Sequence, residues 1–419
     1  MALDKLTQAD LKREIDDLQS RHNGCLLYTS VKARNVDLKA TNLLGINIDK
    51  FFMPSVANVV GTDMSTYKIV KNGQFACNRM HVGRDYRLPV ALSKSDEDFL
   101  VSPAYDVFEI KDTKTLLPEY LMMWFSRKEF DRNAWFYTDA DVRGGLDWEA
   151  FCDMTLPIFS PDKQREIINE YHIILNRIDL NNQLIQKLEE TAQAIYKQWF
   201  VDFDFQNENG EPYKSAGGEM TESELGDIPM GWKVNSFTKT FKLMGGGTPK
   251  TEIESYWNGE IPFFTAKDVT EYYYSFDTER NISLSGLKNC SSRLYPENTT
   301  FVVARGATVG SVALSGKSMA MNQSCYAILG KDAATFFAHQ STLNLMKSLT
   351  AQATGATFGA LVTKNFDEQV IVEPSLKIIK EYEKIMSNVY KSMLDHLKLN
   401  LLLAKTKDLL LSKLATVEN

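Results

Sequence analysis

A carboxylate and a lysine stand two residues apart at Glu109 and Lys111, with Asp96 and Asp98 upstream. Metal-dependent nucleases use two carboxylates to hold Mg²⁺ and a lysine near the attacking water. This spacing is common by chance, and the corresponding stretch of the second half, residues 327–330, contains none of these residue types. A nuclease that uses Glu109 and Lys111 is therefore an alternative interpretation and not the favoured one.

Other catalytic signatures are missing from the sequence. A methyltransferase motif beside a target base would contain a Pro-Pro pair, and the chain has none. The run from Gly310 to Ser318 places five residues between its glycines, where a phosphate-binding loop needs four. The five histidines and five cysteines show no zinc-ligand spacing. We therefore expect no catalysis, and no metal or cofactor bound directly by this chain.

Two basic stretches are better candidates for binding. Residues 78–94 carry four cations and one acid, and residues 288–317 carry the same balance. Arginine and lysine bind phosphates and guanine edges, whereas asparagine and glutamine can read adenine. Each basic stretch could instead be a solvated charged face. The occurrence of such a stretch in both halves favours DNA contact. The candidate DNA-binding residues are Asn78, Arg79, His81, Arg84, Arg87 and Lys94 in the first half, and Thr248, Lys250, Lys267, Arg293, Arg305, Asn322 and Gln323 in the second.

These stretches belong to an internal repeat with an offset of about 220 residues. The tetrapeptide Val-Ala-Leu-Ser occurs at 90–93 and again at 312–315. A repeat of this length predicts two similar domains within one chain. The other matches are Phe75 and Arg79 with Phe301 and Arg305, Tyr105 with Tyr326, Leu146 with Leu361, and Phe151 with Phe366.

Each half ends in a long amphipathic helix, over residues 162–200 and 375–413. Apolar residues of the first helix alternate spacings of four and three, which is the seam of a coiled coil. At 1.5 Å per residue this helix would be about 55–60 Å long. Asn181 lies in the first seam and His396 and Asn400 in the second, and polar residues in a seam fix its register. We expect one antiparallel coiled coil within the chain; a coiled coil between two molecules is the alternative.

The expected fold class is α+β, with two similar domains separated by the two helices and related by a pseudo-two-fold axis. The expected boundaries are 1–160 for the first domain with a short helix over 1–21, 161–205 for the first long helix, 206–231 for an acidic linker, 232–373 for the second domain and 374–419 for the second long helix. No apolar run is long enough for a membrane span. Scattered cysteines without a disulfide spacing indicate the cytoplasm. The net charge of −7 argues mildly against a free-standing nucleic-acid binder.

Several motifs resemble those of the specificity subunits of type I restriction–modification systems. Residues 246–250 (Gly-Gly-Thr-Pro-Lys), 256–264 (Tyr-Trp-Asn-Gly-Glu-Ile-Pro-Phe-Phe) and 304–310 (Ala-Arg-Gly-Ala-Thr-Val-Gly) are similar to the opening and core of one domain subtype of that family. Residues 102–105 (Ser-Pro-Ala-Tyr) and 117–121 (Leu-Pro-Glu-Tyr-Leu) are similar to another subtype. The first half lacks the Gly-Thr-Pro opening, so the two domains are expected to differ in what they bind.

The resemblance implies a non-catalytic DNA-recognition subunit. Each domain would read one half of a bipartite, asymmetric DNA target, and the coiled coil would set the gap between the halves. The implied partners are double-stranded DNA, two modification subunits that bring S-adenosylmethionine, and restriction/translocase subunits. A structural coiled-coil adaptor is a further alternative, in which the repeated domains bind protein.

Overall fold

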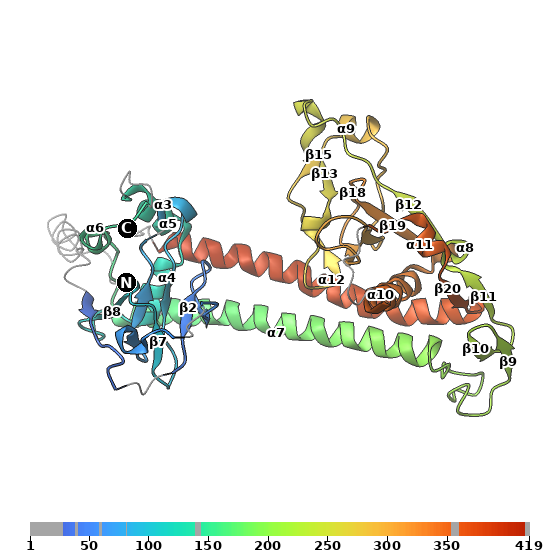
Figure 1. The fold of residues 1–419 in the computed structure, drawn as a ribbon, viewed down its shortest axis with the longest axis horizontal. Helices are drawn as coiled ribbons and strands as arrows, with labels where there is room; N and C mark the ends of the chain where they lie inside the picture. Colours follow the sequence, from blue (N-terminus) through green and yellow to red (C-terminus); the bar gives the residue numbers. More distant parts are fainter. Residues whose placement is uncertain are drawn as a thin grey trace, which may run out of the picture. The chain divides into compact units, whose positions relative to one another are not determined.

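The computed structural model describes residues 28–37, 41–57, 61–80, 82–138, 144–352 and 360–414 (Figure 1). His81 and the helix expected over residues 1–21 lie outside the described residues. The chain divides into two compact units, residues 1–178 with 401–419 and residues 179–400. This division cuts through both long helices, so the domain boundaries expected from the sequence stay predictions. In the described part of the chain, no helix has both the length and the apolar character that crossing a bilayer requires.

The first unit is built on a four-stranded antiparallel sheet in the order β1-β8-β5-β6. Successive side chains of a strand face opposite sides of a sheet. Accordingly, Phe75 and Cys77 of β5 pack among helices, whereas Ala76 packs against two small two-stranded sheets. The strands of the main sheet are β1 (Tyr28–Val31), β5 (Phe75–Cys77), β6 (Val90–Leu92) and β8 (Asp106–Ile110). The small sheets pair β2 (Leu44–Ile46) with β3 (Phe52–Pro54) and β4 (Lys68–Val70) with β7 (Phe99–Val101); the helical segments are η1 (Met64–Thr66), α3 (Val82–Asp85), α4 (Pro118–Phe125), α5 (Lys128–Phe136) and α6 (Trp148–Asp153).

The second unit has a five-stranded sheet in the order β12-β19-β16-β17-β14. Val302 of β16 shares a core with helix α10, while Phe301 and Val303 face a second lobe that contains Phe264. The main strands are β12 (Phe241–Gly245), β14 (Tyr274–Ser275), β16 (Thr300–Val303), β17 (Val312–Ser315) and β19 (Cys325–Gly330), and α10 is Thr335–Gln352. The second lobe contains β13 (Trp257–Phe264), β15 (Asn281–Ile282) and β18 (Ala320–Met321). The other elements are β9 (Met220–Ser223), β10 (Gly226–Pro229), β11 (Lys233–Ser236), β20 (Val370–Glu373), α8 (Phe237–Thr240), α9 (Leu284–Lys288), α11 (Thr363–Asp367), η2 (Glu254–Tyr256), η3 (Ala266–Asp268) and η4 (Lys331–Ala333).

The two units share one sheet topology, which confirms that the chain contains two similar domains. The order β1-β8-β5-β6 in the first unit corresponds to β12-β19-β16-β17 in the second, and every neighbouring pair in both sets is antiparallel. What differs is the layer on the face away from the helices. The first unit places two short β-ribbons there, and the second places the β13-β15-β18 lobe. The predicted α+β class is also confirmed.

The strand pairing corrects part of the sequence match. Phe75 and Thr300 each pair with the leucine of a Val-Ala-Leu stretch, so these two residues occupy the same place in their sheets. Phe75 faces the helices, whereas Phe301 faces the opposite layer. The match of Phe75 with Phe301 is therefore wrong by one residue, because a slip of one position turns a strand side chain to the other face. In the same way, Tyr326 occupies the position of Asp106 in its sheet, and not that of Tyr105.

The same correction applies to the arginines that follow these strands. The Leu146 N–H donates to the Arg79 carbonyl oxygen at 3.0 Å, and the Leu361 N–H donates to the Ala304 carbonyl oxygen at 2.8 Å. The structural counterpart of Arg79 is thus Ala304, and Arg305 lies one residue further along. The two arginines therefore do not occupy equivalent positions in their units.

Helices α7 (Pro161–Phe200) and α12 (Leu376–Lys413) pair with each other in both units. In the first unit, Ile167 near the start of α7 shares a core with Leu411 near the end of α12. In the second unit, the Phe200 ring at the end of α7 lies 4.9 Å from the Tyr382 ring near the start of α12. The start of each helix therefore meets the end of the other, which confirms the antiparallel pairing within one chain.

The polar residues of the seam meet in one layer, inside the second unit. Asn181 is 2% exposed, and its Nδ2 donates to Asn400 Oδ1 at 2.8 Å. The Nδ2 of Asn400 donates in turn to Asn182 Oδ1 at 2.7 Å. His396 Nδ1 lies 3.2 Å from Asn181 Oδ1, where it must act as the donor because a carboxamide oxygen only accepts. The polar side chains of this layer thus satisfy one another's hydrogen bonds inside the seam.

Candidate nucleic-acid interface

Loops at one end of the second unit's main sheet are packed backbone against backbone. Gly246 follows β12, and a Cβ atom there would lie 2.1 Å from the Asn322 carbonyl oxygen. A Cβ atom on Gly247 would lie 2.2 Å from Ser291 Oγ. The Gly247 N–H donates to the Met321 carbonyl oxygen at 3.1 Å. The Gly-Gly-Thr-Pro motif is thus a crossing point that only residues without a side chain can form.

The polar side chains of the motif meet those of the turn before β19. The Thr248 hydroxyl donates to Gln323 Oε1. On the neighbouring strand, the Ala304 N–H donates to the Ser324 carbonyl oxygen at 2.8 Å. Arg305 therefore lies beside the same turn, at the start of the β16–β17 loop.

Lys267 belongs to a turn that is tied to the same place. The carbonyl of Phe264, the last residue of β13, accepts the Asn322 N–H at 3.0 Å. Asp268 is buried, and its carboxylate accepts two backbone N–H groups, each at 2.7 Å. This buried cap makes the turn rigid, while Lys267 stays exposed and pairs with Glu279 at 3.0 Å.

Trp257 and Arg280, which were not among the predicted site residues, support the loop that carries Lys250. The Trp257 Nε1 donates to the Lys250 carbonyl oxygen at 3.2 Å, which holds the loop that carries Lys250. The Arg280 guanidinium stacks on the Trp257 ring at 3.5 Å from its centroid. The Tyr-Trp dipeptide at 256–257 was the available sequence signal, because an indole N–H in a turn usually has a partner.

We call residues 246–250, 264–268, 291–293, 304–311 and 322–324 the loop cluster. It brings together all seven candidate residues of the second half. Among the described residues, Lys250, Arg293 and Arg305 are exposed and make no side-chain hydrogen bond or ion pair. Three cations without an internal partner leave their charge available to a ligand, and phosphate is the anion that such loops commonly bind.

In the first unit, the side chain of Arg79 is bonded to residues of its own unit. The Arg79 Nε pairs with Asp106 at 2.7 Å, and a second nitrogen of the guanidinium donates to the Leu146 carbonyl oxygen. The Trp148 ring lies 5.5 Å away and completes the surroundings. Arg79 is largely covered and joins the β5–β6 loop to the start of α6. It therefore positions the loop and does not project from it.

The other cations of the first loop are exposed and have acidic partners. Arg84 pairs with the neighbouring Asp85 at 2.7 Å, which raises the pKa of its guanidinium. Arg87 pairs with Asp49 at 2.8 Å. The remaining pair is Lys94 with Glu119, and the Asn78 side-chain oxygen accepts the Met80 N–H at 3.2 Å. The excess positive charge that the sequence shows in this stretch is thus offset by carboxylates from other segments.

Exposed aromatic side chains, which were not among the residues predicted from the sequence, lie beside this loop. Tyr86 has a positive φ of 56°, and its ring lies 5.4 Å from that of Trp135. Trp135, Phe136 and Tyr137 at the end of α5 are 45%, 76% and 53% exposed. The run Trp-Phe-Tyr was the signal that could have marked them. Exposed aromatic clusters commonly mark binding surfaces.

The groups of the nuclease interpretation have structural partners. Glu109 accepts a hydrogen bond from Gln74 at 2.9 Å, and Asp98 lies 4.0 Å from Lys71. Within the described ranges, no three His, Cys, Asp or Glu side chains are grouped to hold a metal. Burial raises the pKa of the Cys77 thiol and lowers that of His339 to about 3, so both groups are neutral members of a core. The described residues thus offer the nuclease interpretation no pair of free carboxylates at Glu109 and Asp98.

Comparisons with known proteins point in one direction. The sequence model of the type I restriction modification DNA specificity domain matches residues 229–402. Over 426 aligned residues the chain is 24% identical to the type I restriction enzyme HindI specificity subunit of Haemophilus influenzae, covering 88% of this chain and 92% of that protein. It is 32% identical over 165 residues to the MjaIX specificity subunit of Methanocaldococcus jannaschii, which covers 38% of this chain and 37% of that protein.

A solved structure shares the fold. The crystal structure of the type I restriction–modification S subunit from M. genitalium superposes with a TM-score of 0.54 and 12% sequence identity. The match covers 95% of this chain and 96% of that one. The shared fold therefore covers both units and both long helices.

Proposed function

We propose that this chain is a specificity subunit of a type I restriction–modification system, as its similarity to such proteins supports, and that its two units read the two halves of a bipartite, asymmetric DNA sequence. One observation carries the proposal. The same four-stranded sheet occurs twice, yet the loops at the end of each sheet differ in packing, charge and partners. A repeated scaffold with unlike loops suits the reading of two unlike half-sites, because base-edge contacts depend on which side chains the loops present.

In the second unit, the loop cluster is the proposed reader. Lys250, Arg293 and Arg305 provide cations for phosphates or guanine edges, and Asn322 and Gln323 provide carboxamides for adenine. In the first unit, the β5–β6 loop provides Asn78, Arg84 and Arg87, with His81 in the same stretch. The exposed arginines there would have to exchange Asp85 and Asp49 for phosphate. Such exchange is feasible because exposed ion pairs contribute only about 0–1 kcal/mol.

The paired helices would hold the two readers and set the gap between the half-sites. The buried Asn181–Asn400 hydrogen bond at 2.8 Å supports this part, because one polar pairing in a seam disfavours other registers. The chain would direct two modification subunits, which bind S-adenosylmethionine, and restriction/translocase subunits, and would itself bind no cofactor. We place the complex in the cytoplasm, where the thiols of Cys77, Cys290 and Cys325 would stay reduced.

The test is to express the chain with its modification subunit and to map every methylated site on genomic DNA. We expect one split sequence with two unlike parts and a constant gap. Methylation of a continuous sequence, or methylation without sequence preference, would refute the proposal. The purified chain alone, incubated with DNA and Mg²⁺, should leave the DNA uncut; cleavage that Glu109→Ala abolishes would instead favour the nuclease.

A further inference from the structure

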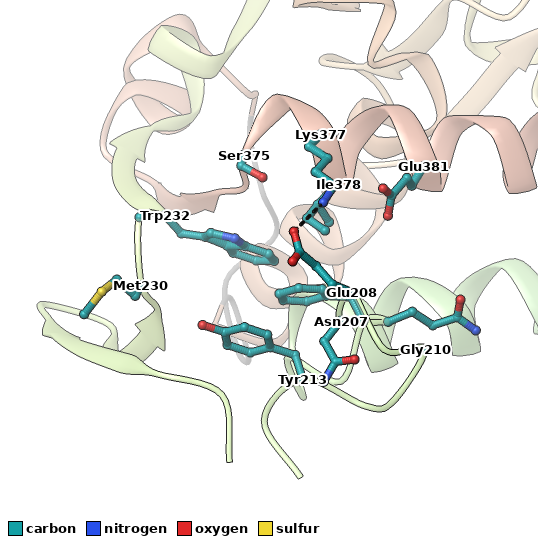
Figure 2. Close-up of a pocket in the computed structure, with 13 residues that line it drawn as sticks. Asn207, Glu208, Gly210, Tyr213, Met230, Trp232, Ser375, Lys377, Ile378 and Glu381 are labelled. Atoms are coloured by element: carbon teal, nitrogen blue, oxygen red, sulfur yellow. Dashed lines mark hydrogen bonds and ion pairs between the residues drawn. The ribbon is translucent and has the colours of Figure 1, made fainter. Parts of the chain in front are cut away.

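A pocket of about 810 Å³ lies in the second unit, where the segment after α7 meets the start of α12 (Figure 2). Its walls include the rings of Phe205, Tyr213 and Trp232 and the charged side chains of Glu208, Lys377 and Glu381. None of the predicted DNA-binding residues lines it. The pocket is therefore a feature apart from the loop cluster.

One wall of the pocket is a stack of three aromatic rings. The Phe205 ring lies 4.7 Å from that of Tyr213 and 5.0 Å from that of Trp232, with interplanar angles of 18° and 19°. The Tyr213 hydroxyl donates to the Glu219 carbonyl oxygen at 2.8 Å, which fixes its ring. Tyr213 is the half-buried outer member of the stack, and the faces of tyrosine rings attract cations.

The charged side chains around the rings are acidic on balance. Glu208 is 88% exposed and pairs with Lys377 at 3.1 Å. Glu381 is exposed one helical turn beyond Lys377 and lines the same pocket, and Figure 2 shows both carboxylates at its upper side. An ion pair this exposed is weak, so a second cation can share or replace Lys377 at Glu208.

The segment that forms the pocket holds the acidity of the whole chain. Residues 201–232 contain eight carboxylates and one lysine, a net charge of −7, which equals the net charge of the full 419 residues. The positive and negative charges of the other 387 residues therefore cancel. Met230 on this segment is 56% exposed and Leu225 is 46% exposed, which adds an apolar rim to the acidic surface.

The aromatic stack, the acidic charge and the apolar rim together favour one class of partner over DNA and over a second copy of this chain. DNA phosphates would be repelled by a surface with this charge, and so would the same surface of a second copy of this chain. Aromatic and methionine side chains with charged groups at the rim are typical of protein interfaces. We propose that the pocket binds a lysine or arginine side chain from a basic segment of a partner protein. Resting on the proposed function, we assign that segment to the modification subunit.

The test measures binding of the full chain to the purified modification subunit, at low and at high salt. Changing Glu208→Gln and Glu381→Gln together removes both pocket carboxylates and keeps their shape. We expect affinity to fall roughly five- to tenfold at low salt, as two weakened ion pairs predict, and the loss to shrink at high salt. The matched control, Glu252→Gln with Glu254→Gln, changes the same charge on exposed residues outside the pocket and should bind as the wild type does.

The outcomes separate the inference from the function on which it rests. If the wild-type chain binds the modification subunit and the pocket variant binds it equally well, the inference is overturned and the proposed function stands. If the pocket variant and the control lose affinity to the same extent, general acidity is responsible and the pocket is not. If the pocket variant loses DNA affinity but keeps the modification subunit, the pocket serves DNA. If the wild-type chain binds no modification subunit, both proposals fall.

Discussion

Two arginines that the sequence aligns should respond in opposite ways to removal. Arg305 is exposed and has no side-chain partner among the described residues, so Arg305→Ala should change the free energy of unfolding by no more than about 0.5 kcal/mol. Arg79 pairs with Asp106 at 2.7 Å and also donates to a backbone carbonyl, and both groups are largely covered. Arg79→Ala should therefore cost about 2 kcal/mol, the typical penalty for stranding partly buried polar partners.

Arg305→Ala, which should hardly affect stability, should impair DNA recognition. If Arg305 contacts a guanine edge, Arg305→Ala should cost about 1–3 kcal/mol in discrimination at one half-site. If it contacts a phosphate instead, binding should weaken for all sequences, and the slope of log K against log salt should fall by about 0.9. Either result leaves the other half-site unchanged, because Arg305 belongs to one unit only.

The assay uses the chain in complex with the modification subunit that we propose as its partner. Chemical denaturation gives the stability of each variant, methylation mapping gives the half-site preference, and a salt titration gives the slope. The reasoning fails if Arg305→Ala destabilises the fold as strongly as Arg79→Ala does. It also fails if Arg305→Ala leaves affinity, salt slope and half-site preference all unchanged.

Three further predictions follow from packing and burial. Asn181→Leu strands Asn400 in the helix seam and should lower the free energy of unfolding by about 1–3 kcal/mol, whereas adding Asn400→Leu should recover part of that loss in a denaturant titration. Gly246→Ala puts a methyl group 2.1 Å from a backbone oxygen and should abolish recognition of one half-site in methylation mapping; Gly245→Ala, with nothing within 4 Å, is the control and should leave recognition intact. Burial raises the pKa of Glu189 from 4.5 to about 7, so the folded chain holds a proton that the unfolded chain releases, and stability should fall as pH rises between these values. Glu189→Gln should reduce, without abolishing, the fall of the melting temperature over that range, because burial also raises the pKa of Glu383 to about 7; an unchanged slope would contradict this account.

The long helices could be predicted because their signal is local. A seam with spacings of four and three identifies the buried side of a helix without any knowledge of its partner. The polar residues also indicated where the partner must match, and Asn181 does meet Asn400. The order of the repeated elements could be read in the same way, from short matching stretches.

The register of the strands could not be predicted, and the reason is physical. The loop between β5 and β6 covers residues 78–89, whereas the loop between β16 and β17 covers 304–311. A hairpin with a different loop can shift its pairing while the flanking sequence still looks alike. Arg79 and Arg305 matched in type and approximate place, yet one occupies the position of Ala304 and the other does not.

The sequence also could not predict which cations form ion pairs in the fold. Arg79 and Lys94 find their acids at Asp106 and Glu119, more than twenty residues away along the chain. Counting charges within one stretch cannot include partners that the fold brings from elsewhere. Among the described residues, the difference between the unpaired Lys250, Arg293 and Arg305 of the loop cluster and the paired cations of the first loop is a result of tertiary structure.

Net charge is a poor guide to what this chain binds, because its charge is unevenly distributed. The total of −7 argued against DNA, yet residues 201–232 alone account for all of it. Outside that segment the charges balance, and the loop cluster still offers Lys250, Arg293 and Arg305 without internal partners. A protein of this kind would bind DNA weakly by itself, because few phosphates meet an unpaired cation and each such contact adds only part of the affinity. Tight binding would then require basic surface from a partner, and an acidic segment set apart from the readers is a suitable place for that partner to dock.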